Sequence, residues 1–261
     1  MCVTCGCSEN TAVTLTHSHQ LPDGTTLTHT HETNLLESAQ HHAQVHGHTI
    51  TLEAEILGKN NLIAAQNRTE FISQNILALN LMSSPGAGKT TLLTRTITDL
   101  KSQLNFNVIE GDQETFRDAD KIRETGCDVV QINTGKGCHL EAKMVQQGYQ
   151  QLPAPMNSIL MIENVGNLVC PALFDLGEKA KVAILSVTEG EDKPLKYPHL
   201  FRASDVMILT KIDLLPYLNF DLEFCLNAAR QVNSQIKIFQ VSALTGVGLN
   251  DWYDWLKTKA K

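Results

Sequence analysis

The sequence predicts an α/β protein whose mostly parallel sheet is covered by helices on both faces and preceded by a flexible Cys/His-rich tail. Two observations support this fold class. Short apolar runs alternate with amphipathic runs over about 200 residues, as in parallel sheets with crossover helices. The composition also changes abruptly near residue 49. We therefore expect a tail over residues 1–48 and one globular domain over residues 49–261, because 261 residues with 42% apolar content can bury one sizeable core.

The first 48 residues differ in composition from the rest. All 21 basic residues lie at or after Lys59, whereas three of the seven cysteines lie within the first seven residues. Large apolar side chains are sparse, so this segment cannot bury enough surface to offset its ordering entropy, and we expect it to be flexible. Eight of the ten histidines lie in it: His17, His19, His29, His31, His41, His42, His46 and His48. Together they are typical of a cation reservoir of low specificity.

The domain elements follow from periodicity and from turn residues. Residues 52–73 predict one or two helices that lead into the domain. The expected strands are Ile76–Met82, Asn107–Ile109, Asp128–Ile132, Ser158–Ile162, Val182–Val187, Val206–Leu209 and Ile236–Val241. The expected helices are Thr90–Gln103, Phe116–Glu124, Leu140–Gln151, Asp221–Asn233 and Leu249–Lys257.

Charge and hydropathy exclude several classes of function. A net charge of −7 argues against a broad basic surface for nucleic acid. The apolar runs are shorter than the roughly 20 residues needed to cross a bilayer. The sequence starts with neither an apolar run nor a basic residue, so it shows no secretory signal. We expect a soluble cytoplasmic protein with no nucleic-acid or membrane partner.

A phosphate-binding loop opens the domain. The first strand runs into Ser83-Ser84-Pro85-Gly86-Ala87-Gly88-Lys89-Thr90-Thr91, which matches the template G-x-x-x-x-G-K-[ST] except that Ser83 replaces the first glycine. Backbone N–H groups of such a loop point at phosphate oxygens, Lys89 would reach the β- and γ-phosphates, and Thr90 would hold Mg²⁺. A glycine-rich turn without a ligand is the alternative. It is disfavoured because it gives no reason for Lys89 and Thr90. The predicted phosphate-binding residues are Pro85, Gly86, Ala87, Gly88, Lys89, Thr90 and Thr91.

Two later segments indicate guanine. Thr210-Lys211-Ile212-Asp213 follows a strand at the edge where nucleotide sites form, and resembles the N-K-x-D motif with Thr210 in place of Asn. Asp213 could accept both donors of guanine, and the stem of Lys211 could lie along the base. Ser242, Ala243 and Leu244 resemble the loop that contacts the guanine oxygen. Each segment alone could be a solvated turn, but in order after a P-loop they favour GTP over ATP.

Carboxylates follow two other strands. Asp112 lies in Glu110-Gly111-Asp112, and Glu163 follows an unbroken apolar strand. Carboxylates at neighbouring strand ends are suited to Mg²⁺. An N-cap is the alternative for Asp112. We predict that Lys89, Thr90, Asp112 and Glu163 form the catalytic set, with Thr90, Asp112 and Glu163 at the magnesium.

A second group of metal-type ligands lies near these loops. Cys138 and His139 are adjacent, and Cys170 comes seven residues after Glu163. Two thiols and an imidazole suit Zn²⁺ or Ni²⁺. The spacing alone favours two unrelated thiols and a histidine that caps a helix. However, Cys170 shares a loop with the predicted magnesium ligand Glu163, which favours a metal site that responds to the nucleotide. Cys127 and Cys225 have no ligand-like neighbours, and we expect ordinary reduced thiols there.

The amino-terminal cysteines have the sharpest metal-binding spacing. Cys2, Cys5 and Cys7 form C-x-x-C-x-C, which can close around one cation with three thiolates. A redox pair or a cluster ligand set are alternatives. A redox C-x-x-C ordinarily begins a helix of a thioredoxin-like unit, whereas this one lies in a tail.

These motifs together resemble the nickel-incorporation GTPases of hydrogenase maturation, the HypB type. The resemblance covers almost the whole chain and is most specific over Glu163–Pro171, ENVGNLVCP. The related urease accessory GTPases are expected to carry Cys-Pro-His, whereas this chain has Cys138-His139 and a separate Cys170. The resemblance implies a P-loop GTPase that forms a homodimer on GTP binding and delivers nickel to the [NiFe]-hydrogenase large-subunit precursor, with a second nickel-maturation accessory protein as partner.

The resemblance also implies roles for particular residues. It implies Ni²⁺ at Cys2, Cys5 and Cys7, a weaker Zn²⁺ or Ni²⁺ site at Cys138, His139 and Cys170, and Lys196 reaching the nucleotide of the other subunit. The expected cofactors are GTP, Mg²⁺, Ni²⁺ and Zn²⁺. Three alternative functions remain open: a urease-type nickel GTPase, a nickel buffer with little GTP turnover, and a regulatory GTPase whose tail detoxifies metal.

Overall fold

The structure is a computed structural model, and it describes the backbone of residues 15–20 and 26–31 together with residues 55–112, 117–135, 137–153 and 155–260. The chain divides into two units, Met1–Glu55 and Ile56–Lys261. In the first unit, β1 (Leu15–Gln20) and β2 (Thr26–His31) form an antiparallel pair that the sequence did not predict. The predicted ligands Cys2, Cys5 and Cys7 lie outside the described residues.

The second unit contains a seven-stranded sheet with the order β5-β4-β6-β3-β7-β8-β9, and every neighbouring pair is parallel. This confirms the predicted fold class. The strands are β3 (Leu77–Ser83), β4 (Asn105–Asp112), β5 (Asp128–Asn133), β6 (Ser158–Glu163), β7 (Ala180–Ser186), β8 (Val206–Thr210) and β9 (Lys237–Gln240). The central strand β3 is buried along its whole length, because helices cover both of its faces.

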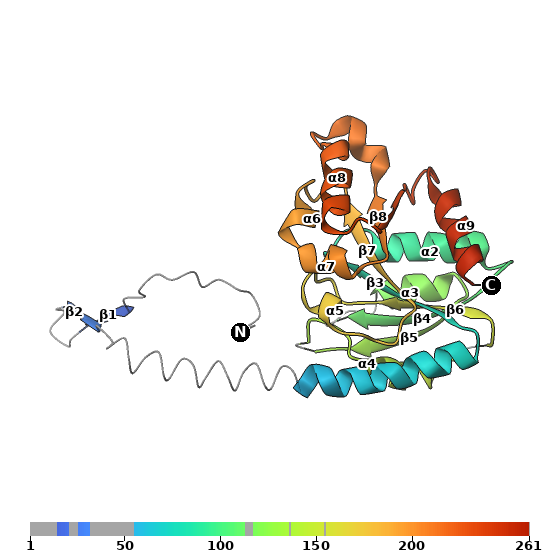
Figure 1. Cartoon of the computed structure of the whole chain (residues 1–261), viewed down its shortest axis with the longest axis horizontal. Coiled ribbons are helices and arrows are strands. Elements are labelled where there is room, and N and C mark those ends of the chain that lie inside the picture. The colour runs from blue at the N-terminus through green and yellow to red at the C-terminus, as the bar shows by residue number, and fades with distance from the viewer. Residues whose placement is uncertain are drawn as a thin grey trace. The chain divides into compact units, whose positions relative to one another are not determined.

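Helices cover the two faces of the sheet (Figure 1). On one face α2 (Lys89–Leu100), α3 (Arg117–Glu124) and α9 (Leu249–Lys259) pack on a core that includes Leu79 and Trp252. The opposite face carries two smaller cores. They are covered by a helix over residues 55–73 and by α4 (Ala142–Tyr149), α7 (Pro198–Ala203) and α8 (Leu222–Val232). None of the helices in the described ranges is long and apolar enough to span a membrane.

Short helices are the main difference from the predicted elements. The sequence did not predict α5 (Cys170–Leu173), α6 (Lys193–Lys196), α7 or the 3₁₀ helix η1 (Ile212–Tyr217). Helices of one or two turns show no reliable apolar period, and proline at the first or second position of α5, α6 and α7 gives only a local signal.

Two element boundaries also differ in a way that matters for the site. Strand β4 continues to Asp112, because Glu110 pairs with Glu163 of β6 and Asp112 pairs with Asn133 of β5. Helix α4 begins at Ala142 rather than at the predicted Leu140. The backbone N–H of Leu140 donates to the side chain of Asn164 instead, so Leu140 belongs to the loop before the helix.

Candidate functional site

The glycine-rich loop connects β3 to α2 at the edge where the parallel strands end. It borders a cleft of about 540 Å³ that is lined by residues 84–91 of the loop, by acidic side chains and by Lys211. Gly88, the N-cap of α2, has a φ of 93°, which strains any residue with a Cβ. The predicted phosphate-binding residues Pro85, Gly86, Ala87, Gly88, Lys89, Thr90 and Thr91 all line this cleft.

Ser83 supports the lysine of the loop. Lys89 Nζ donates a hydrogen bond to Ser83 Oγ at 3.0 Å. Ser83, which replaces the first glycine of the template, therefore places a hydroxyl beside the ammonium group of Lys89. The lysine lies at the start of α2, where the backbone N–H groups add positive potential for an anion.

Two glutamates lie side by side beneath the loop. Glu110 and Glu163 are register partners on β4 and β6, and Thr90 Oγ1 donates to Glu163 Oε1 at 2.7 Å. Within the described part of the chain, the second oxygen of each glutamate, Oε2, is buried and makes no hydrogen bond. Burial and the charges of Glu163, Asp112 and Asp118 raise the pKa of Glu110 to about 8. Burial likewise raises the pKa of Glu163, against the opposing effect of Lys89 and Thr90.

This arrangement fits a hard cation. A hydroxyl and two carboxylates with oxygens left over are ligands of the kind that Mg²⁺ takes. Asp112, the other predicted ligand, is half-buried and also lines the cleft. Glu110, Asp118 and Lys121 also line the cleft, although the motifs predicted no role for them. The alternation along β4 could have indicated Glu110, since it shares a face with Phe106 and Val108, the side that packs beneath α2.

The segments predicted to contact the base follow the last two strands of the chain, β8 and β9. Thr210 Oγ1 donates to the carbonyl of Ala87 at 2.6 Å, and Lys211 Nζ donates to the carbonyl of Gly86 at 2.8 Å. Thr210, which stands where the template has Asn, therefore ties this segment to the phosphate loop. Asp213 lies in the first turn of η1.

The second base-reading segment, Ser242-Ala243-Leu244, follows β9. Arg95 Nη1 of α2 donates to the carbonyl of Ala243 at 3.1 Å, and Leu244 is 80% exposed. Asp213 and these three residues do not line the cleft, which ends at Lys211 on this side.

Cys170 lies close to the adjacent residues Cys138 and His139, although it comes much later in the sequence. One ligand atom from each lies within 4.8 Å of the others, and all three residues are half-buried. Cys138 Sγ is 3.6 Å from His139 Nδ1. Burial lowers the pKa of His139, which favours the neutral imidazole that binds metals. His139 Nε2 is buried and has no hydrogen bond to any described residue, while the ring stacks on Phe174 with centroids 3.9 Å apart.

The chemistry of this trio fits a borderline metal. Two thiols and an imidazole are ligands for Zn²⁺ or Ni²⁺, and three protein ligands leave a coordination position for a further group. Cys127 and Cys225 are apart from this trio, and burial raises the pKa of each thiol to about 12. Both cysteines are free, in agreement with the expectation of ordinary reduced thiols.

Lys196 lies outside the cleft. It is on α6, its side chain is 64% exposed, and its Nζ is 2.6 Å from Asp192 Oδ2. The structure therefore gives it no contact with the nucleotide loop of its own chain. A role in a partner subunit stays a prediction.

A glycine-rich loop that leads from a buried parallel strand into a helix beginning with Lys89 and Thr90 defines a P-loop nucleotide-binding protein. The profile of the family described as "CobW/HypB/UreG, nucleotide-binding domain" matches residues 77–240. The chain therefore belongs to the CobW/HypB/UreG family and, by the relatives below, to its HypB group.

Two relatives illustrate the similarity. The "Hydrogenase maturation factor HypB" of Escherichia coli strain K12 is 58% identical over 210 residues, which cover 80% of this chain and 72% of that protein. The "Hydrogenase/urease maturation factor HypB" of Helicobacter pylori strain J99 is 37% identical over 229 residues, which cover 86% and 94%.

Two solved structures share the fold. HypB from Archaeoglobus fulgidus has a TM-score of 0.74 at 35% identity and covers 78% of this chain and 100% of that one. HypB from Helicobacter pylori in complex with nickel has a TM-score of 0.74 at 38% identity and covers 77% and 95%. The resemblance drawn from the motifs is thus confirmed.

Proposed function

We propose that the protein hydrolyses GTP and uses the nucleotide state to control the binding and release of nickel for a [NiFe]-hydrogenase large-subunit precursor. The names of its HypB relatives and the nickel complex of the Helicobacter pylori protein support this role. One observation carries the coupling: Glu163, the last residue of β6, accepts a hydrogen bond from Thr90, and the segment that follows it leads directly to Cys170 of the metal-type trio.

Charge stabilisation is the main work of the nucleotide site in this proposal. Lys89 and the N–H groups of residues 86–90 stabilise the phosphate oxygens, on which charge shifts during hydrolysis. Thr90, Asp112, Glu163 and Glu110 would hold Mg²⁺, which would neutralise charge on the β- and γ-phosphates. The arrangement needs no general base, because positioning of water and of charge suffices for phosphoryl transfer.

Guanine recognition rests on Asp213 with Lys211, supported by Ser242, Ala243 and Leu244. A carboxylate can accept from both N1–H and the 2-amino group of guanine, whereas adenine offers no such pair of donors. The bonds from Thr210 and Lys211 to the phosphate loop favour this assignment, since they join the base segment to the P-loop.

Nickel is the cargo in this proposal. Cys2, Cys5 and Cys7 take Ni²⁺ in the tail, and Cys138, His139 and Cys170 take Ni²⁺ or Zn²⁺ in the domain. GTP favours a homodimer, in which Lys196 reaches the nucleotide of the partner subunit. A second nickel-maturation accessory protein takes part in the transfer, which takes place in the cytoplasm.

Mass by light scattering tests this function. The full chain is measured with GDP or with a non-hydrolysable GTP analogue, each with and without Ni²⁺. A dimer that forms with the GTP analogue and responds to Ni²⁺ is the expected result. A monomer in all four conditions overturns the coupling and favours the nickel-buffer alternative. The Helicobacter pylori relative is a hydrogenase/urease maturation factor, which keeps a urease-type role as a second candidate. Assays of nickel transfer to the hydrogenase and urease apoenzymes distinguish the two roles.

A further inference from the structure

Asn164 lies between the nucleotide cleft and the metal-type trio. It follows Glu163 directly, is 1% exposed and lines the cleft. Its Oδ1 accepts hydrogen bonds from the backbone N–H groups of Leu140 (3.1 Å) and Val165 (3.0 Å). Its Nδ2 donates to Asn80 Oδ1 at 3.1 Å. One buried carboxamide therefore joins three separate segments of the chain.

The first connection reaches Cys138 and His139. Leu140 follows His139 directly, and its N–H is held by Asn164. The side chain of Leu140 is fully buried and packs on Gly111, where a Cβ would lie 2.7 Å from Leu140 Cγ. Gly111 stands between Glu110 and Asp112, so the acidic end of β4 and the Cys138-His139 segment cannot shift independently of each other.

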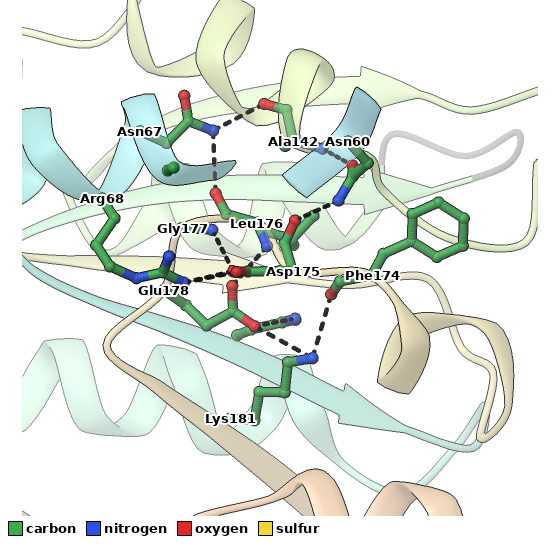
Figure 2. A network of polar contacts seen from close by, with 12 residues as sticks. Asn60, Asn67, Arg68, Ala142, Phe174, Asp175, Leu176, Gly177, Glu178 and Lys181 are labelled. Carbon is green, nitrogen blue, oxygen red and sulfur yellow. Dashed lines mark hydrogen bonds and ion pairs between the residues drawn. The ribbon is translucent and has the colours of Figure 1, made fainter. Parts of the chain in front are cut away.

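The second connection reaches Cys170. Asn80 Nδ2 donates to Glu178 Oε1 at 3.3 Å, and Glu178 lies 3.6 Å from Lys181 Nζ. Lys181 Nζ donates to the carbonyls of Ala172 (3.0 Å) and Phe174 (3.3 Å), at the end of the short helix α5 that Cys170 begins. Figure 2 shows Lys181 between the carboxylate of Glu178 and the carbonyl of Phe174.

The helix over residues 55–73 holds the outer side of the same network. Asn60 donates to the carbonyl of Asp175 at 2.7 Å and accepts from the N–H of Ala142 at 2.8 Å (Figure 2). Asn67 donates to the carbonyls of Ala142 and Leu176. These bonds hold the segments that follow the two halves of the trio.

We propose that Asn164 is a positioning residue that couples the nucleotide state to the geometry of Cys138, His139 and Cys170. This inference rests on the proposed function, since it requires both sites to bind their ligands. A change at Glu163 shifts the backbone of Asn164, which moves Leu140 through one hydrogen bond and α5 through Asn80, Glu178 and Lys181. Only a carboxamide serves here, because the position needs two acceptor bonds and one donor bond at once.

The test measures a ratio of affinities. A reference protein carries Cys2→Ser, Cys5→Ser and Cys7→Ser in the full chain, so that thiolate-to-nickel absorbance reports only the domain site. Its Kd for Ni²⁺ is measured with GDP and with the non-hydrolysable GTP analogue. The ratio of the two values is expected to be about tenfold, within the usual range of allosteric coupling. By linkage, Ni²⁺ must change the relative affinity for the two nucleotides by the same factor.

Asn164→Ala in this reference is expected to bring the ratio to within about twofold of one, while Ni²⁺ and nucleotide each still bind. Asn107→Ala is the matched control, because Asn107 is also a buried carboxamide of this sheet, and its amide atoms make no hydrogen bond to any described residue. It should keep the full ratio. A full ratio in Asn164→Ala overturns the inference, whereas a ratio of one already in the reference overturns the coupling in the proposed function and the inference with it.

Two further variants keep the test decisive if Asn164→Ala does not fold. Asn164→Asp retains both acceptor bonds and loses only the donor to Asn80, and Lys181→Met cuts the same branch at its far end, outside the cleft. Both should lower the ratio to an intermediate value. An undiminished ratio in both variants overturns the branch through Asn80.

Discussion

Glu110 and Glu163 stand at the same level on neighbouring parallel strands, and each has one buried carboxylate oxygen without a hydrogen bond in the described structure. Two carboxylates so close repel each other when both are ionised, which contributes to the raised pKa of Glu110. A divalent cation removes this repulsion. The pair is therefore costly for the fold alone, and a bound Mg²⁺ would offset this cost.

Glu163→Gln tests the role of the second glutamate. The amide oxygen can still accept from Thr90 Oγ1, so the packing of the loop is preserved while the charge is lost. We expect the kcat of GTP hydrolysis to fall by about 100-fold and its dependence on Mg²⁺ concentration to shift upward. Turnover measured as phosphate release against Mg²⁺ checks this, and an unchanged Mg²⁺ dependence would contradict it.

The raised pKa of Glu110 predicts how the stability of the protein without ligands depends on pH. Because its folded pKa is about 8 and its unfolded value near 4.5, the folded state binds more protons between these values. The contribution of Glu110 to the free energy of unfolding is therefore fully present below about pH 4.5 and is lost progressively as the pH rises through 8. Glu110→Gln should flatten this slope, which amounts to about 2 kcal/mol between pH 6 and pH 8, and should stabilise the protein at pH 8. Urea unfolding at pH 6 and pH 8 measures both effects. A steeper slope in the variant would contradict the assignment.

Cys170→Ser tests the metal-type trio. We expect the affinity of the domain for Ni²⁺ to fall by at least about 100-fold, more than the effect typical of an outer-shell partner. GTP binding should stay within about twofold, because Cys170 does not line the cleft. Cys225→Ser is the matched control, a buried thiol of α8 outside the trio. Equal loss of nickel and nucleotide binding in Cys170→Ser would show that the two ligand sets are not separate.

Asp213→Asn tests base recognition. An amide group presents a donor towards the donors of guanine, so GTP affinity should fall by about 100-fold, and xanthosine triphosphate, which has an oxygen at position 2, should bind better than to the natural protein. Competition against a fluorescent nucleotide measures this. Asp251→Asn, an exposed carboxylate at the start of α9, should change neither affinity. Equal affinities for GTP and ATP in the unaltered protein would remove the basis of the assignment.

Lys196→Ala tests the contribution of one subunit to the other. The hydrolysis rate should fall by at least about tenfold at protein concentrations that give dimers, because a cation near the transferred phosphate is lost, while GTP binding to the monomer is unchanged. Lys193→Ala is the control on the same helix, where the lysine side chain is only 22% exposed and lies near Glu189. If the hydrolysis rate per subunit does not depend on protein concentration in the unaltered protein or in Lys196→Ala, the partner subunit does not contribute a lysine.

The sequence by itself determined the class of fold and the local motifs. The apolar periods of strands and helices are visible in the sequence itself. The P-loop consists of consecutive residues, so Gly86–Thr91 could be assigned from the sequence. The adjacency of Cys138 and His139 was equally visible, as was the segment from Glu163 to Cys170.

Only the tertiary structure decided which of these segments meet. The pairing of β4 with β6 sets Glu110 against Glu163, and neither strand encodes its neighbour in its own residues. The approach of Cys170 to His139, and the hydrogen bonds by which Asn164 joins Leu140 to Asn80, likewise depend on the order of strands in the sheet. Periodicity reports which face of an element is buried but not what lies against it. The residues that connect the two sites can therefore be identified only when the pairing of the strands is known.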